Sequence, residues 1–233
     1  MNAIRLGEHL VEPVVTVLRV AHLAMKNNNY LVVDPVTRDA LLVDPAWQPE
    51  IIEAALADAG ARLRGILLTH AHADHVHLAE PLSERHACPV WMSAREIAAS
   101  GYRAARLAGF DAAPWQVGRL RIVPLATPGH TPGCVCYLIG AHLFTGDVLF
   151  NEGCGMCPDV AAARVMYDSL AMLKARLAPH TRVYPGHTYF APPGLTFTEV
   201  LERNMYLQFR DPHSFAAYRM RKGQDVSRWF DFR

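Results

Sequence analysis

The densest group of chemically useful side chains in this chain is the run Thr69-His70-Ala71-His72-Ala73-Asp74-His75. It places three imidazoles and one carboxylate within six residues, and these groups are ligands that suit zinc, iron and manganese. The preceding residues 65–68, Gly-Ile-Leu-Leu, are short and apolar, so they predict a buried strand that ends at the motif. Because a strand end fixes the origin of the next loop, the motif predicts a metal site rather than a His-rich turn.

Three further candidate ligands, His130, Asp147 and His187, also follow short runs typical of strands. Pro-Gly comes directly before His130 and before His187, which allows the backbone to turn tightly and to approach a metal closely. Either His alone would be equally well explained as an ordinary core or surface residue. The repeated pattern instead predicts that several strand ends converge on one edge of a layered α/β structure.

Hydrophobic periodicity and turn residues predict the elements that must position these groups. Residues 21–29, which include Asn27-Asn28-Asn29, predict a polar loop, and Ser93 and Asp159 predict helix caps. Asp44 precedes Pro45 and is either a hydrogen-bond acceptor for a ligand imidazole or simply a turn residue. Runs typical of strands are 14–20, 30–33, 40–43, 65–68, 89–92, 117–125, 134–139, 142–145 and 183–184; helices are predicted at 50–59, 78–85, 93–100, from 159, and over much of the chain from 196.

The overall composition sets limits on partners and location. The 233 residues are 51% hydrophobic and 19% charged, enough for one large domain with a sizeable core. A net charge of +1 gives no reason to expect nucleic acid or an anionic membrane as a partner. No run is long and apolar enough for a signal peptide or a membrane span, and an odd count of five Cys fits a reducing compartment. We therefore expect a cytoplasmic protein.

The ligand pattern resembles the metallo-β-lactamase fold superfamily, whose motif His-x-His-x-Asp-His is followed by His, Asp and His at later strand ends. The resemblance implies an α/β protein with an αββα sandwich, in which residues 1–195 form the catalytic domain and residues 196–233 a short helical extension packed near the site. It also implies two divalent ions, zinc first, with iron or manganese possible. The implied ligands are His70, His72 and His130 for one ion, Asp74, His75 and His187 for the other, and Asp147 as the bridge.

Within the superfamily the chain is most similar to the glyoxalase II branch, which hydrolyses acyl-glutathione thioesters. The similarity rests on residues 43–45, 127–131, 144–147, 153–155 and 184–187. Tyr189 matches a Tyr that contacts glutathione in that branch. Met156 departs from it, because glutathione-using members carry Lys or Arg at this position. Acyl-glutathione hydrolysis is therefore an alternative rather than the leading expectation.

Residues 151–157, together with the tail at 204–209 and 215–222, are similar to a narrower group, the glyoxalase-II-like hydrolases of bacterial trans-acyltransferase polyketide clusters. This similarity implies an acyl thioester substrate, for which an acyl carrier protein and pantetheine are the candidate carriers. Residues 201–233 hold seven Lys or Arg against four Asp or Glu. Arg219, Arg221 and Lys222 could meet a phosphate or an acidic carrier at the site entrance, or could form an ordinary solvated face.

The expected reaction is attack of a metal-bridged hydroxide on the acyl carbonyl, with Asp74 as the catalytic residue that binds metal and orients the hydroxide. A persulfide dioxygenase with one iron is an alternative, because its ligand motif overlaps this one. A nuclease or phosphodiesterase is disfavoured by the charge balance. Cys154 and Cys157 have the spacing of a redox pair, but ordinary loop packing is the better interpretation.

Overall fold

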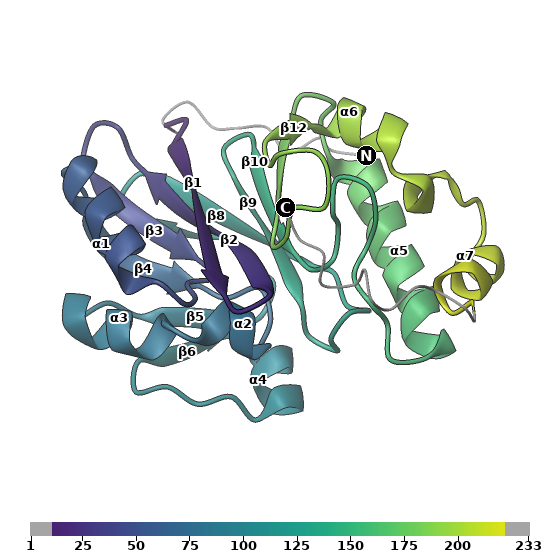
Figure 1. Ribbon diagram of the computed structural model, residues 1–233, viewed down its shortest axis with the longest axis horizontal. Helices are drawn as coiled ribbons and strands as arrows, with labels where there is room; N and C mark the ends of the chain where they lie inside the picture. The colour runs from purple at the N-terminus through teal and green to yellow at the C-terminus, as the bar shows by residue number, and fades with distance from the viewer. Residues whose placement is uncertain (1–10, 222–233) are drawn as a thin grey trace.

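The computed structural model describes residues 11–221, in which two six-stranded sheets lie face to face and helices cover the outer side of each (Figure 1). The first sheet has the order β1-β2-β3-β4-β5-β6 and the second the order β12-β11-β10-β9-β8-β7. The strands of the first sheet are β1 (Val14–His22), β2 (Met25–Val33), β3 (Asp39–Val43), β4 (Arg62–Leu67), β5 (Val90–Ser93) and β6 (Leu107–Phe110). Those of the second are β7 (Trp115–Val117), β8 (Leu120–Ala126), β9 (Val135–Ile139), β10 (His142–Gly146), β11 (Arg182–Pro185) and β12 (Leu195–Thr196).

Helices form the two outer layers and the connections near the sheet edge. They are α1 (Pro49–Asp58), α2 (Ala73–Val76), α3 (Ala79–His86), α4 (Ala94–Ser100), α5 (Val160–Arg176), α6 (Phe197–Arg203), the 3₁₀ helix η1 (Met205–Gln208) and α7 (Pro212–Arg219). The predicted caps are confirmed, since Ser93 accepts from the Glu96 amide and Asp159 from the Ala162 amide. No helix within residues 11–221 has both the length and the apolar character needed to cross a bilayer.

Strand alternation assigns side chains to the layers. Along β2 and β3, Leu31 and Leu42 pack with α1 and α3 on the outer face, whereas Tyr30 and Leu41 pack between the sheets. Both faces are therefore buried, which explains why the strand sequences are apolar runs rather than strict alternations. This arrangement of helix, sheet, sheet and helix confirms the predicted αββα sandwich.

The prediction of a polar loop at residues 21–29 is wrong, because β2 begins at Met25 and includes three buried asparagines. Each side-chain amide has a specific partner; the Nδ2 group of Asn28, for example, donates to the Pro185 carbonyl oxygen at 3.0 Å. Such tertiary contacts outweigh the turn preference of Asn27, Asn28 and Asn29. The sequence analysis also missed β6 and β7, which are edge strands of four and three residues, too short to show a period.

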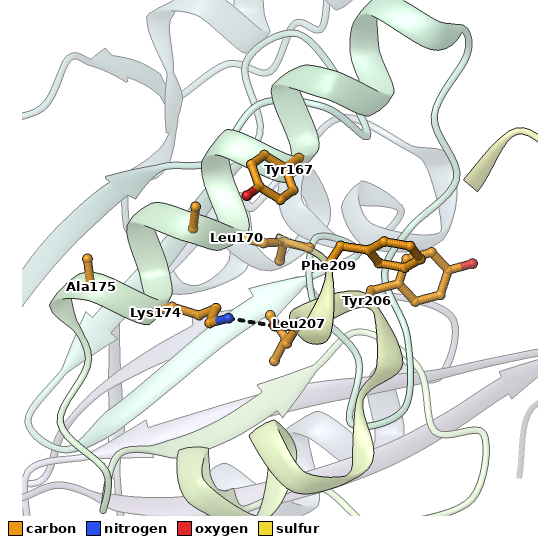
Figure 2. Close-up of a pocket in the computed structure, with 8 residues that line it drawn as sticks. Tyr167, Leu170, Lys174, Ala175, Tyr206, Leu207 and Phe209 are labelled. Atoms are coloured by element: carbon orange, nitrogen blue, oxygen red, sulfur yellow. Dashed lines mark hydrogen bonds between the residues drawn. The ribbon is translucent and has the colours of Figure 1, made fainter. Parts of the chain in front are cut away.

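The C-terminal segment packs onto α5 and shares the core of the second sheet, to which Phe197 and Phe215 contribute. Figure 2 shows side chains of α5 and η1 that line a groove. The volume of this groove is about 280 Å³, and at its edge Lys174 Nζ donates to the Leu207 carbonyl oxygen at 2.6 Å. None of the candidate metal ligands lines this groove. Thr196 belongs to β12, which pairs with β11. The division into a catalytic domain up to residue 195 and an extension from residue 196 remains a prediction.

Tyr137 links the two sheets next to the start of the His-rich motif at residues 69–75. Its hydroxyl donates to the buried Leu68 carbonyl oxygen at 2.8 Å. We expect Tyr137→Phe to lower the free energy of unfolding by about 1–3 kcal/mol, since it leaves a buried carbonyl without this donor. Urea unfolding would measure the change. Tyr102→Phe is the control, because the Tyr102 hydroxyl makes no hydrogen bond within residues 11–221; an equal loss in both variants would contradict the assignment.

Candidate metal centre

Four chain segments meet at one edge of the sandwich, and each follows the end of a strand. His70 follows β4 in the first sheet, whereas His130, Asp147 and His187 follow β8, β10 and β11 in the second. β3 and β4 are parallel, as are β10 and β11, so their carboxyl ends lie at the same edge. The structure therefore brings together the residues that the sequence singles out, from both sheets.

The first group of candidate ligands consists of three imidazoles. His72 Nδ1 lies 3.0 Å from His70 Nε2 and 3.0 Å from His130 Nε2. Ligand atoms around a tetrahedral zinc, at the usual zinc–nitrogen distance, are roughly 3.3 Å apart. The three nitrogen atoms therefore have about the separation that one shared ion requires.

The second group comes from α2 and the loop after β11. Asp74 Oδ2 lies 3.3 Å from His187 Nε2 and 3.6 Å from His75 Nε2. Asp147 reaches both groups, because its carboxylate oxygens lie 3.4 Å from His75 Nε2, 3.5 Å from His187 Nε2 and 3.7 Å from His130 Nε2. Asp147 therefore lies within reach of both groups of candidate ligands.

Two buried atoms in this cluster, His75 Nε2 and Asp147 Oδ1, lie 3.4 Å apart but make no hydrogen bond of acceptable geometry within the described residues. A buried polar atom without a hydrogen bond costs about 1–3 kcal/mol, and such atoms are uncommon in folded proteins. Because both atoms point into the same cluster of nitrogen and oxygen ligands, a divalent ion would satisfy them together. The chemistry of the residues present therefore fits a metal centre.

The two groups differ in the charge that their surroundings favour. Burial and the neighbouring imidazoles lower the pKa of His70 well below its ordinary value and also lower the pKa of His72, so both stay neutral with lone pairs available. Burial opposes a charge on His187, but the Asp147 and Asp74 carboxylates outweigh it and raise the pKa of His187 to about 9. An ion bound by this second group would replace a proton.

A model of the metallo-beta-lactamase superfamily matches residues 24–187, which include all seven candidate ligands. The chain belongs to the metallo-beta-lactamase superfamily. The resemblance seen in the sequence is thereby confirmed.

Individual relatives agree with this membership. The chain is 39% identical over 209 residues to "Probable polyketide biosynthesis zinc-dependent hydrolase PksB" of Bacillus subtilis (strain 168), which covers 89% of this chain and 92% of the relative. It is also 39% identical to the hydrolase of the same description named BaeB, from Bacillus velezensis, over 89% and 93% of the two chains. The crystal structure of ETHE1 from Myxococcus xanthus matches with a TM-score of 0.78 and 28% identity, over 93% of this chain and 95% of that one.

In this member of the superfamily, buried carboxylates hold the ligand loops in place. Asp44 Oδ2 lies 3.0 Å from His75 Nδ1 and accepts from Thr69 Oγ1 at 2.6 Å, so His75 presents Nε2 to the cluster. Asp44 is therefore a hydrogen-bond acceptor for a ligand imidazole, which resolves the two interpretations that the sequence left open. On α4, buried Glu96 accepts from the Ala71 amide at 3.0 Å through Oε1 and from Thr131 Oγ1 at 2.8 Å through Oε2, joining the loops of the first group.

Backbone carbonyl groups orient two further candidate ligands, His130 and His187. His130 Nδ1 donates to the Met156 carbonyl oxygen at 2.8 Å, and His187 Nδ1 donates to the Lys26 carbonyl oxygen at 2.7 Å. Sequence reasoning missed these partners because a carbonyl group is present at every residue. Sequence reasoning also missed Glu96. Its position three residues after Ser93 suggests a capping box, in which the Glu side chain would bond to the helix N-terminus, but here the side chain reaches the ligand loops.

The predicted substrate-binding residues Met156 and Tyr189 both lie in loops beside the centre. Met156 is 40% exposed, and its carbonyl group contacts His130. Tyr189 is half-buried against Phe150, with ring centroids 5.1 Å apart, and burial raises the pKa of its phenol. Cys154, in the same loop as Met156, is a free buried thiol that packs in the core, as loop packing predicts.

Arg219 is not the exposed charge that either interpretation of the basic tail requires. Arg219 is only 9% exposed, because its side chain lies in the C-terminal layer and donates from Nη1 to the Tyr206 hydroxyl at 3.0 Å. Arg221 is exposed and lies over the Tyr218 ring, 3.8 Å from the centroid. Lys222 lies outside the described residues.

Gly186 allows the backbone to pass close to the second group, since a Cβ atom there would lie 2.6 Å from Asp147 Oδ1 and 2.6 Å from His75 Cε1. We expect Gly186→Ala to displace these ligands and to weaken zinc binding by about 10–100-fold, measured by competition with a chelator. Gly109→Ala is the matched control, because its Cβ atom would meet side chains no closer than 3.4 Å. Unchanged affinity in Gly186→Ala would show that the close approach is unimportant.

Proposed function

We propose that this protein is a binuclear zinc-dependent hydrolase that cleaves acyl thioesters. The observation that carries the proposal is the convergence of seven ligand side chains, whose neighbouring donor atoms lie 3.0–3.7 Å apart. In this proposal His70, His72 and His130 hold one ion, Asp74, His75 and His187 hold the other, and Asp147 bridges them. Iron or manganese could replace zinc, since all the ligands are nitrogen or oxygen donors.

The relatives support the reaction class and its setting. Both carry the words zinc-dependent hydrolase and polyketide biosynthesis in their names, and each matches 89% of this chain. We extend both to this chain and assign the substrate as an acyl thioester, on pantetheine or on an acyl carrier protein. A thioester suits the centre because a free thiol has a pKa of about 8.5, so its thiolate leaves without a strong acid.

When bound, two divalent ions would supply Lewis acidity and a water molecule whose pKa is lowered from about 15.7 toward 7. The residues around them provide orientation. Burial opposes ionisation of Asp74, but the hydrogen bond from His187 and the charge on His75 outweigh it and hold the pKa of Asp74 below its usual range. Asp74 therefore stays ionised and can accept a hydrogen bond from an attacking water molecule.

Substrate would approach from the side of the first group. Among the candidate ligand histidines His72 is exposed, whereas the side chain of His130 is only 6% exposed and His70, His75 and His187 are buried. The open face of the centre thus lies on the side of His72, in the loop after β4. Met156 lies beside His130 of the first group, and Tyr189 follows His187 of the second group by two residues. Burial keeps the Tyr189 phenol protonated, so it can donate a hydrogen bond to the acyl or thiol part of a substrate.

Glutathione and persulfide substrates are the alternatives that the sequence left open. The two carboxylates of glutathione need cationic partners, and Met156 offers an apolar side chain at the expected position. A one-iron dioxygenase shares the ligand motif, so the ligand residues do not separate it from a two-ion hydrolase. The names of both relatives, as zinc-dependent hydrolases, favour the hydrolase.

We expect about two zinc ions per chain in fully loaded, active protein, measured by elemental analysis, because two ligand groups share one carboxylate. Asp147→Ala should lose ions from both groups and nearly all turnover. Asp168→Ala, which removes an exposed carboxylate from α5, is the control and should keep both. A single ion in active wild-type protein would contradict the proposed centre.

A thioester panel tests the substrate class. We expect kcat/KM to be at least tenfold higher for acyl-pantetheine or acyl-carrier protein than for acyl-glutathione, a difference of about 1.4 kcal/mol in transition-state binding. Met156→Lys should raise turnover of acyl-glutathione without helping acyl-pantetheine. Equal efficiency on glutathione thioesters would refute the assignment, and oxygen uptake with a persulfide substrate would support the dioxygenase instead.

A further inference from the structure

Asn27 holds the Asp74 side chain in one orientation. Its Nδ2 group donates to Asp74 Oδ2 at 3.0 Å and to the Asp74 carbonyl oxygen at 2.9 Å. Asn27 is 3% exposed and comes from β2, whereas Asp74 lies on the four-residue helix α2. One amide group therefore fixes both the backbone and the carboxylate of Asp74 relative to the first sheet.

The orientation of the Asn27 amide is itself set by Trp47. The indole Nε1–H of Trp47 donates to Asn27 Oδ1 at 2.8 Å. An indole nitrogen can only donate, so the oxygen of the Asn27 amide must face Trp47 and the NH₂ group must face Asp74. Without the indole donor, the amide could rotate and present its oxygen to the Asp74 carboxylate.

Trp47 is held by ring contacts with two histidines. The ring stacks on His22 with centroids 4.9 Å apart, and His77 packs on it at 4.9 Å. The backbone of Trp47 has φ +68°, a left-handed conformation that is uncommon for a bulky residue and that persists only where surrounding contacts enforce it. This unusual backbone places the indole nitrogen at Asn27.

The same turn between β3 and α1 also carries Asp44, again with a positive φ of +50°, which contacts His75. The turn therefore orients both of the adjacent ligand residues of α2. Asp44 acts directly on His75, and Trp47 acts on Asp74 through Asn27.

We propose that Trp47, acting through Asn27, is a positioning residue for Asp74 and thereby determines how tightly the second ligand group holds its ion. The inference rests on the proposed function only in giving Asp74 the role of a metal ligand. Groups that orient metal ligands through hydrogen bonds typically change metal affinity by about 10–100-fold. The first group, which Glu96 supports from α4, should be unaffected.

The test is stepwise zinc titration of the metal-free full-length protein by chelator competition, which measures two affinities without any substrate. Trp47→Phe keeps an aromatic ring beside His22 and His77 but removes the N–H donor, and we expect the affinity of one ion to fall by about 10–100-fold while the other stays within about twofold. Trp115→Phe is the matched control. The Trp115 ring is also packed among aromatic side chains, but its buried nitrogen makes no hydrogen bond within the described residues.

Asn27→Asp provides a second variant if Trp47→Phe folds poorly. It keeps an acceptor for Trp47 but places a carboxylate oxygen against Asp74, and it should weaken the same ion. Unchanged affinities, or equal weakening of both ions, would overturn the inference. If wild-type protein binds a single ion, the proposed binuclear centre is wrong. The positioning role then holds only if Trp47→Phe lowers the affinity for that ion more than Trp115→Phe does.

Discussion

The organisation of this protein depends on keeping ionisable side chains together at a largely dehydrated sheet edge. Burying a charge is expensive unless opposite charges and hydrogen bonds surround it. Here Asp147 is placed between His75 and His187, and their charges, against the opposing effect of burial, hold the pKa of Asp147 well below its usual value. The elements around the centre supply the opposite charges and hydrogen bonds that these buried groups require.

The residues around the centre also form contacts between the two sheets. The backbone N–H of Asn28 in the first sheet donates to the Gly186 carbonyl oxygen at 2.8 Å. The backbone N–H of Val135 in the second sheet donates to the Thr69 carbonyl oxygen at 3.0 Å. Both bonds involve residues next to a candidate ligand. The geometry of the centre and the docking of the sheets are therefore determined by the same contacts.

The resemblance carried by the ligand motif predicts the sandwich, which the structure confirms, and the candidate ligands stand out because their signal is local. Strand-end motifs and apolar runs can be recognised within a few residues, and the ligand types are chemically distinctive. The supporting residues escape such reasoning because their roles depend on partners far away in the chain. Asn27 resembles a turn residue until Asp74 and Trp47 are placed beside it, and Arg219 resembles a surface charge until Tyr206 covers it.

The origin of the first ligand group in both sheets has a thermodynamic consequence. His70 and His72 follow β4 of the first sheet, but His130 follows β8 of the second, and buried Glu96 joins their loops. A chain in which only one sheet has formed therefore offers an ion an incomplete set of ligands. A ligand that binds only the folded state adds its binding free energy to the stability of that state. An ion held here would therefore stabilise the packing of the two sheets against each other.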